Sequence, residues 1–153
     1  SGLIRYVIDD ELEVTGFYEK VPCFLFLGRK MTVDLVGEKI DQITAQKVLA
    51  TFQHEDYVPV SLLGIEFCEI KKPHYILLSE GDLSKQPSAA ELDELLKENF
   101  HYELARNLGQ LDEPEVKHVD DAWHYYKTLA MHNGMIEGNI KPEPLKKMKT
   151  KII

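Results

Sequence analysis

Short apolar runs alternate with turn-forming residues over the first part of the chain. The runs cover residues 3–8, 12–17, 23–27 and 31–36. Between them lie Asp9-Asp10, residues 18–22 and Gly28, which favour turns. Short runs bounded in this way are typical of strands joined by tight connections. The pattern therefore predicts antiparallel hairpins and not strands linked by crossover helices.

The spacing of the apolar residues becomes helical after residue 42. The residues that carry this spacing are Ile43, Val48, Leu49 and Phe52. Thr44 is predicted to cap this helix, which should end before residues 54–56. Two apolar runs follow, at residues 60–70 and 74–78, and the turn residues 71–73 separate them. We expect this pair of strands to form the centre of a sheet.

The second half of the chain predicts two more helical regions and another strand. Ser88 and Glu91 have the spacing of a capping box, and the leucines that follow form a helical stripe. Helical character continues over residues 100–108 and ends at Gly109, while residues 116–119 resemble a strand. A last helix is expected over residues 122–132. Strand pairs that alternate with helices indicate an α+β fold, in which helices pack on an antiparallel or mixed β-sheet.

Composition and charge narrow the classes of function. A chain of 153 residues with 44% hydrophobic residues has the size and apolar content of one domain. The formal net charge of -8, without a basic stripe, argues against a nucleic-acid partner. No apolar run approaches membrane-spanning length, and no signal peptide is recognisable, so no membrane partner is expected. Cys23 and Cys68 lie in apolar runs and are predicted to be reduced structural thiols, which favours a cytoplasmic protein.

Lys141 is the most informative polar residue. Gly138 precedes it, and Pro142 and Pro144 follow it. Because glycine permits a turn and proline disfavours helix before it, Lys141 should project from an extended loop, where its ammonium group suits an anionic ligand. The alternative is a solvated C-terminal tail, because more lysines follow, at positions 146, 147, 149 and 151. The segment alone leaves both interpretations open.

Three patterns, in the same order along the chain, resemble the C-terminal domain of the auxin-responsive acyl-acid amido synthetases. Residues 5–17 contain Asp-Asp followed by Val-Thr-Gly-Phe, similar to the family's Tyr-Arg-x-Gly-Asp stretch that leads to Val-Thr-Gly-Phe. Residues 26–29, Phe-Leu-Gly-Arg, precede a Glu-Lys turn within residues 35–40. Residues 92–111 then lead on to Gly-Asn-Ile-Lys-Pro at residues 138–142. The order and spacing of the patterns carry the resemblance, which spans nearly the whole chain.

The resemblance implies that residues 3–153 are the small, mobile C-terminal lid domain of an adenylate-forming ligase. A large N-terminal domain, absent from this sequence, would bind ATP, with Mg, and the acyl acid. In such enzymes a carboxylic acid is activated as an acyl-adenylate and transferred to an amine, here expected to be an amino acid. The chain alone would then be inactive. Ser1-Gly2 in place of an initial Met suggests a scar left by tag cleavage.

The resemblance also assigns roles to four residues. Lys141 matches the family's phosphate-contacting lysine and is the predicted catalytic residue. Lys39 matches a second lysine on the phosphate side, and Asp10 matches the aspartate that holds the nucleotide ribose. Arg29 follows the hinge strand, where it could touch a phosphate or brace the contact between domains. Lys39, Asp10 and Arg29 are therefore predicted to bind ATP.

Several positions depart from the family pattern. Asp9 replaces a glycine, Val7 replaces an arginine, and Asn139 stands where glutamine is usual. The arginine expected beyond Lys141 is absent. These changes indicate a diverged member, with the hinge and ribose binding at Asp10 most affected.

A metal site and a non-catalytic binding module are the two other functions to consider for this sequence. The histidines at positions 118, 124 and 132 match no metal-site spacing, so no metal site is predicted in this chain. A non-catalytic α+β module that binds a ligand or partner is the alternative to the ligase. Such a module would need neither Lys141 nor Asp10.

Overall fold

The chain divides into two compact units. The computed structural model describes residues 10–29, 32–66 and 71–149. Unit 1 comprises Ser1–Met31 and unit 2 comprises Thr32–Ile153. The domain predicted over residues 3–153 stays a prediction.

Unit 1 is an antiparallel hairpin of β1 (Asp10–Tyr18) and β2 (Val21–Arg29). Glu19, with a φ of 54°, supplies the left-handed residue of the short turn between the strands. The predicted hairpin is therefore confirmed, while the strand expected at residues 3–8 lies outside the described residues. Cys23 is a free thiol and is exposed, contrary to the expected structural role, whereas Cys68 lies outside the described residues.

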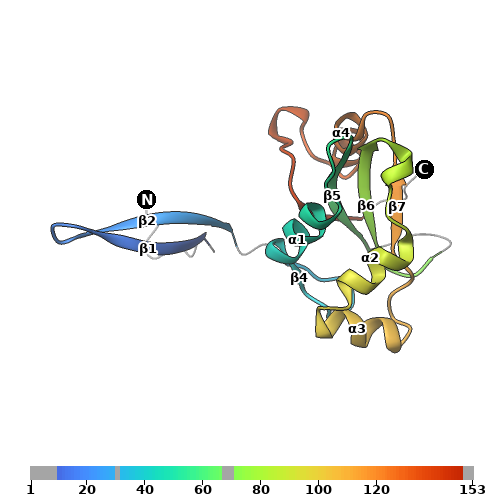
Figure 1. Ribbon diagram of the computed structural model, residues 1–153, viewed down its shortest axis with the longest axis horizontal. Helices are drawn as coiled ribbons and strands as arrows, with labels where there is room; N and C mark the ends of the chain where they lie inside the picture. Colours follow the sequence, from blue (N-terminus) through green and yellow to red (C-terminus); the bar gives the residue numbers. More distant parts are fainter. Residues whose placement is uncertain (1–9, 30–31, 67–70, 150–153) are drawn as a thin grey trace. The chain divides into compact units, whose positions relative to one another are not determined.

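Unit 2 is built on a four-stranded mixed sheet with the strand order β7-β6-β5-β8. The central strands, β5 (Tyr57–Ile65) and β6 (His74–Gly81), are antiparallel. The outer strands, β7 (Glu115–His118) and β8 (Leu145–Met148), run parallel to β6 and β5 respectively. The predicted α+β class, mixed sheet and central strand pair are confirmed (Figure 1).

Helices pack against both faces of this sheet (Figure 1). On one face Leu62 and Leu77 pack with α1 (Gln42–Phe52), α2 (Ala89–Leu96) and α3 (Phe100–Asn107). On the other face Leu63 and Leu78 pack with α4 (Ala122–His132). Successive side chains of a strand point to opposite faces, so neighbours in the chain enter different cores. This explains why β5 and β6 are buried at most of their positions.

The short elements complete unit 2. They are the two-stranded pair β3 (Thr32–Val33) and β4 (Ile40–Asp41), and the 3-10 turns η1 (Leu83–Lys85) and η2 (Glu137–Asn139).

The helix caps confirm one prediction and correct another. The Ser88–Glu91 capping box is present, since the Glu91 amide donates to Ser88 Oγ at 3.2 Å and the Ser88 amide donates to Glu91 Oε2 at 2.8 Å. Thr44 does not cap α1. The cap is Asp41, whose Oδ1 accepts from the Thr44 amide at 2.7 Å. Asp41 has the extended backbone that a cap requires, whereas Thr44 is already helical.

Helix α3 begins anew at its own cap and does not continue α2. Asn99 Oδ1 accepts from the amides of His101 and Tyr102, at 3.0 and 3.1 Å. Gly109, with a φ of 64°, ends the helical region as predicted. A buried polar contact then joins the two helices.

Asp93 of α2 is the acceptor of that contact and is only 5% exposed. Its carboxylate accepts from the Tyr102 hydroxyl at 2.8 Å and from Arg106 Nε and Nη2 at 2.8 and 3.2 Å. Lys97 pairs with it at 2.8 Å. Burial raises the pKa of Asp93, but the hydrogen bonds from Arg106, Lys97 and Tyr102 outweigh burial, so the pKa lies below its ordinary value.

Replacing Asp93 by Asn should lower the free energy of unfolding by about 3 kcal/mol at pH 7, because it leaves a half-buried guanidinium without its charge partner. A depressed carboxyl pKa stabilises the fold above the unfolded-state pKa, and this contribution decreases as the pH falls below about 4. Urea titrations of both chains at pH 7 and pH 3 measure the difference. If Asp93→Asn lowered the free energy of unfolding by the same amount at pH 7 and at pH 3, this account would be contradicted.

Candidate functional site

Lys141 lies in the loop between η2 and β8, and its side chain is exposed. The chain is fixed on both sides of it. Ile140, 8% exposed, packs into the core that α4 covers. Beyond Lys141, the carbonyl of Glu143 accepts from Ser61 Oγ at 2.7 Å, and the carbonyl of Pro144 accepts from the Leu62 amide at 2.8 Å. Lys141 therefore projects from a loop, as the sequence predicted, and the structure adds that the backbone of this loop is attached to β5.

Lys146 and Lys147, which follow Lys141, lie in a strand and not in a solvated tail. Leu145 and Met148 are buried at the two ends of β8. Lys146 pairs with Glu143 at 2.8 Å. Lys147 donates to the Asp34 carbonyl at 2.8 Å and pairs with Glu66 at 3.1 Å. The tail interpretation is therefore wrong over residues 145–148, because pairing with β5 gives this segment a buried place.

Lys39 is the exposed residue of a tightly held turn. Its φ is 49°, in the left-handed region that a residue with a Cβ rarely adopts. Glu38 before it and Ile40 after it are both fully buried. The Glu38 carboxylate accepts from the amides of Leu35 and Val36, each at 2.9 Å.

A tyrosine of the central sheet completes the contacts of this carboxylate. The Tyr75 hydroxyl donates to Glu38 Oε1. Burial first, and then the charge of Glu38, raise the pKa of Tyr75 well above its ordinary value, so the hydroxyl keeps its proton and remains a donor. A second hydrogen bond lies within the turn itself and does not involve Glu38. The amide of Gly37, which has a φ of 113°, donates to Asp34 Oδ1 at 2.6 Å.

The segment before this turn rests on β5. Gly64 of β5 has no Cβ, and a Cβ built there would lie 2.5 Å from Val33 Cγ1 and 3.4 Å from Leu35 Cδ2. Any larger residue would therefore push the segment away from the strand. The two segments that carry the candidate lysines therefore both contact β5. The segment before Lys39 does so at Gly64, and the loop after Lys141 does so at Ser61.

Asp10 and Arg29 lie in unit 1, at the open end of the hairpin. Their Cα positions are partners in the register of β1 and β2. The structure thus makes neighbours of Asp10 and Arg29, whereas Lys39 and Lys141 occupy separate loops of unit 2.

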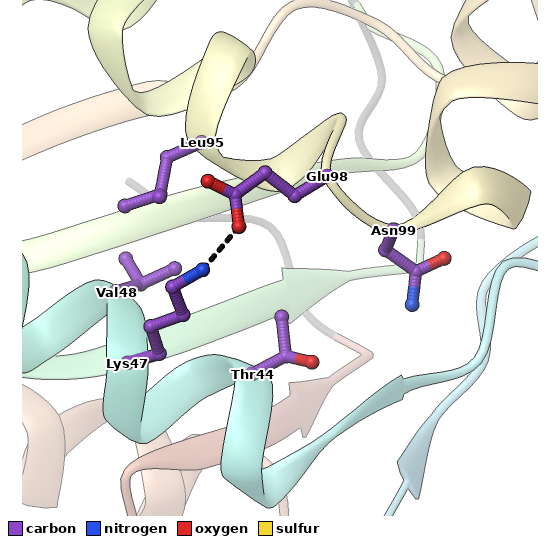
Figure 2. Close-up of a pocket in the computed structure, with 6 residues that line it drawn as sticks. All are labelled: Thr44, Lys47, Val48, Leu95, Glu98 and Asn99. Atoms are coloured by element: carbon purple, nitrogen blue, oxygen red, sulfur yellow. Dashed lines mark hydrogen bonds and ion pairs between the residues drawn. The ribbon is translucent and has the colours of Figure 1, made fainter.

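A pocket of about 220 Å³ lies between α1 and the end of α2. Figure 2 shows Lys47 and Glu98 pointing toward each other across it, and the two side chains form an ion pair. Its other lining residues are Thr44, Val48, Leu95 and Asn99. None of the predicted site residues lines this pocket. Its one lysine is paired with Glu98.

Sequence reasoning missed the roles of Glu38 and Ser61. The Glu-Lys turn drew attention only to its lysine, and an isolated serine within an apolar strand gave no signal. The contacts of Glu38 with Tyr75 and of Ser61 with Glu143 join residues far apart in the chain, so no local pattern predicts them. Over the described residues, no group of three His, Cys, Asp or Glu side chains could hold a metal ion. The same ranges contain no helix with the length and apolarity required to cross a bilayer.

Comparison with known proteins gives family matches over two stretches of the chain. The profile of the GH3 family C-terminal domain matches residues 42–149, and that of the GH3 family central domain matches residues 1–29. Lys141 lies within the first match and Asp10 and Arg29 lie within the second, while Lys39 falls between the two.

One curated relative is the probable indole-3-acetic acid-amido synthetase GH3.11 of Oryza sativa subsp. japonica. It is 29% identical over 107 residues, which cover 65% of this chain and 18% of the relative. The chain therefore spans less than a fifth of that protein's length.

Two solved structures share the fold. GH3.15 acyl acid amido synthetase superposes with a TM-score of 0.64 at 21% identity, over 95% of this chain and 29% of the other. AtGH3.15 acyl acid amido synthetase in complex with 2,4-DB gives a TM-score of 0.61 at 17% identity, over 90% and 27%. The C-terminal-domain profile matches most of unit 2, and the central-domain profile matches the hairpin. Because these matches cover more than half of its residues, this chain belongs to the GH3 family.

Proposed function

We propose that this chain is the C-terminal part of an ATP-dependent acyl-acid amido synthetase. The observation that carries the proposal is the match of both family profiles in the family's order, together with a synthetase as the curated relative. A large N-terminal domain that binds ATP and the acyl acid would belong to the same longer protein. The alternative of a non-catalytic module is less favoured, because the relatives found are synthetases.

The exposed apolar side chains of the hairpin support this arrangement. Seven large apolar side chains of unit 1 are each at least half exposed: Leu12, Val14, Phe17, Tyr18, Val21, Phe24 and Leu25. An isolated two-stranded hairpin is at best marginally stable in water, and such apolar surface normally packs against another element. The central-domain match suggests that further parts of that domain, elsewhere in the longer protein, cover it.

In the proposed reaction a carboxylate of the acyl acid attacks the α-phosphorus of ATP, and pyrophosphate leaves. An amine, proposed to be that of an amino acid, then attacks the acyl carbon, loses a proton and displaces AMP. Negative charge builds up on the phosphate oxygens during the first step. A positioned ammonium group stabilises that charge best where water is excluded.

The geometry of Lys141 fits this role. Its ammonium group is exposed, while Ile140 and Glu143 fix the backbone on either side. A lysine on a lid can contact phosphate in one half-reaction and withdraw for the other. Lys39, exposed on a turn of comparable rigidity, would supply a second phosphate contact. Asp10 would accept from the ribose hydroxyls of ATP, and Arg29 would contact a phosphate or brace the domain boundary.

ATP and Mg are part of this proposal, and so is a cytoplasmic location. The exposed ammonium groups of Lys39 and Lys141 suit a polyphosphate, whereas the remaining contacts, including those to Mg, would come from the N-terminal domain.

Replacing Lys141 by Ala in the full-length parent should slow adenylation by about a hundredfold or more, because charge stabilisation of this kind is worth several kcal/mol in a preorganised site. Pyrophosphate exchange into ATP measures the step. Lys149→Ala removes the same charge from a nearby exposed position and serves as the matched control. Equal rates for the Lys141 and Lys149 variants would refute the assigned role.

The 153-residue chain alone should not catalyse pyrophosphate exchange, because the acyl pocket and most contacts to ATP would lie elsewhere in the parent. Labelled pyrophosphate incubated with the chain, ATP and a panel of carboxylic acids tests this expectation, with the parent enzyme as positive control. Exchange by the isolated chain would show that the assignment of the ATP site to another domain is wrong.

A further inference from the structure

Glu38 is a buried carboxylate to which the proposed function assigns no role. It is fully buried, and its two oxygens together accept three hydrogen bonds. The donors are the amides of Leu35 and Val36 and the hydroxyl of Tyr75. Burying a carboxylate is costly unless its oxygens are satisfied, and here each oxygen has at least one donor.

The residue that follows has an unfavourable backbone conformation. A φ of 49° at Lys39 brings its Cβ close to the backbone, which is unfavourable for a residue other than glycine. The conformation persists because the buried side chains of Glu38 and Ile40 fix the backbone on both sides. A flexible turn with Gly or Asn at position 39 would avoid the strain, but would lose the lysine.

We propose that Glu38 is a positioning residue for Lys39, which it holds in the direction needed to contact phosphate during adenylation. This inference rests on the proposed function. The link is geometric. The carboxylate binds two amides at the start of the turn and Tyr75 in the central sheet, so the position of the turn on the sheet, and with it the direction of Lys39, depends on this one side chain.

A carboxylate is needed because every group facing it is a donor. Glutamine has almost the same shape, but its NH₂ group would face an amide or the tyrosine hydroxyl, and at least one donor would lose its acceptor. Tyr75→Phe removes only one of the three donors and leaves both amide contacts in place. Glu38→Gln and Tyr75→Phe therefore both disturb the contact between the turn and the sheet, and Tyr75→Phe disturbs it less.

The test uses the full-length parent and four variants: Lys39→Ala, Glu38→Gln, Tyr75→Phe and the double variant Glu38→Gln with Lys39→Ala. We expect Lys39→Ala and Glu38→Gln each to slow pyrophosphate exchange by about tenfold or more, and Tyr75→Phe to have a smaller effect. The double variant should be no slower than Lys39→Ala alone, because Glu38 acts only through Lys39.

Multiplied losses in the double variant, or an unchanged rate for Lys39→Ala or Glu38→Gln, would overturn the proposal. If Glu38→Gln instead damaged the fold in general, the double variant would be slower than Lys39→Ala alone. Comparing the double variant with the two single variants therefore separates positioning from unfolding. Amide formation from pre-synthesised acyl-adenylate gives a second readout, since it bypasses the first step. We expect that rate to be unchanged by Glu38→Gln, and an equal loss in both half-reactions would count against positioning.

The failure of this inference is distinguishable from that of the proposed function. A wild-type parent that exchanges no pyrophosphate with any carboxylic acid would refute the synthetase assignment. A wild-type parent that exchanges normally, with additive variants, would refute only the role of Glu38.

Discussion

The strand β5 supports both loops that present the candidate lysines. Its Ser61 hydroxyl and Leu62 amide bind the carbonyls of residues 143 and 144, and the missing Cβ of Gly64 lets Val33 and Leu35 approach. β5 is a central strand of the sheet, and its Ser61, Leu62, Leu63 and Ile65 are buried. A displacement of β5 would therefore move both loops.

Three buried polar side chains of unit 2 each fix the geometry of a turn, a helix pair or a loop. Glu38 satisfies two amides of a turn, Asp93 joins α2 to α3, and Ser61 attaches the loop before β8. Each contact is directional, so it fixes geometry in a way that apolar packing alone does not. The exposed lysines at positions 39 and 141 are positioned by such neighbours, and their ammonium groups remain accessible to an anion. This division of roles fits a domain that supplies only a few atoms to a larger active site.

Much of the fold followed from local patterns. Periodicity predicted the β5–β6 pair, α4 and the first hairpin, because apolar spacing reflects the faces that an element buries. The Ser88–Glu91 box predicted the start of α2, since its hydrogen bonds are local. Thr44 was the wrong cap for α1, because Asp41 three residues earlier has the same capping chemistry and an extended backbone. β8 was not predicted, because its lysines resemble a solvated tail until pairing with β5 buries Leu145 and Met148.

The sequence by itself determined the α+β class, the family resemblance and the identity of the candidate residues Lys141, Lys39, Asp10 and Arg29. Residue type and spacing are local properties, so they can be recognised without coordinates. Only the tertiary structure decided that the hairpin is a separate unit, that residues 145–148 form a strand and that Glu38, next to the exposed Lys39, is buried. Those features depend on contacts such as Tyr75 with Glu38 and Ser61 with Glu143. Such partners are dozens of residues apart in the chain, and folding alone brings them together.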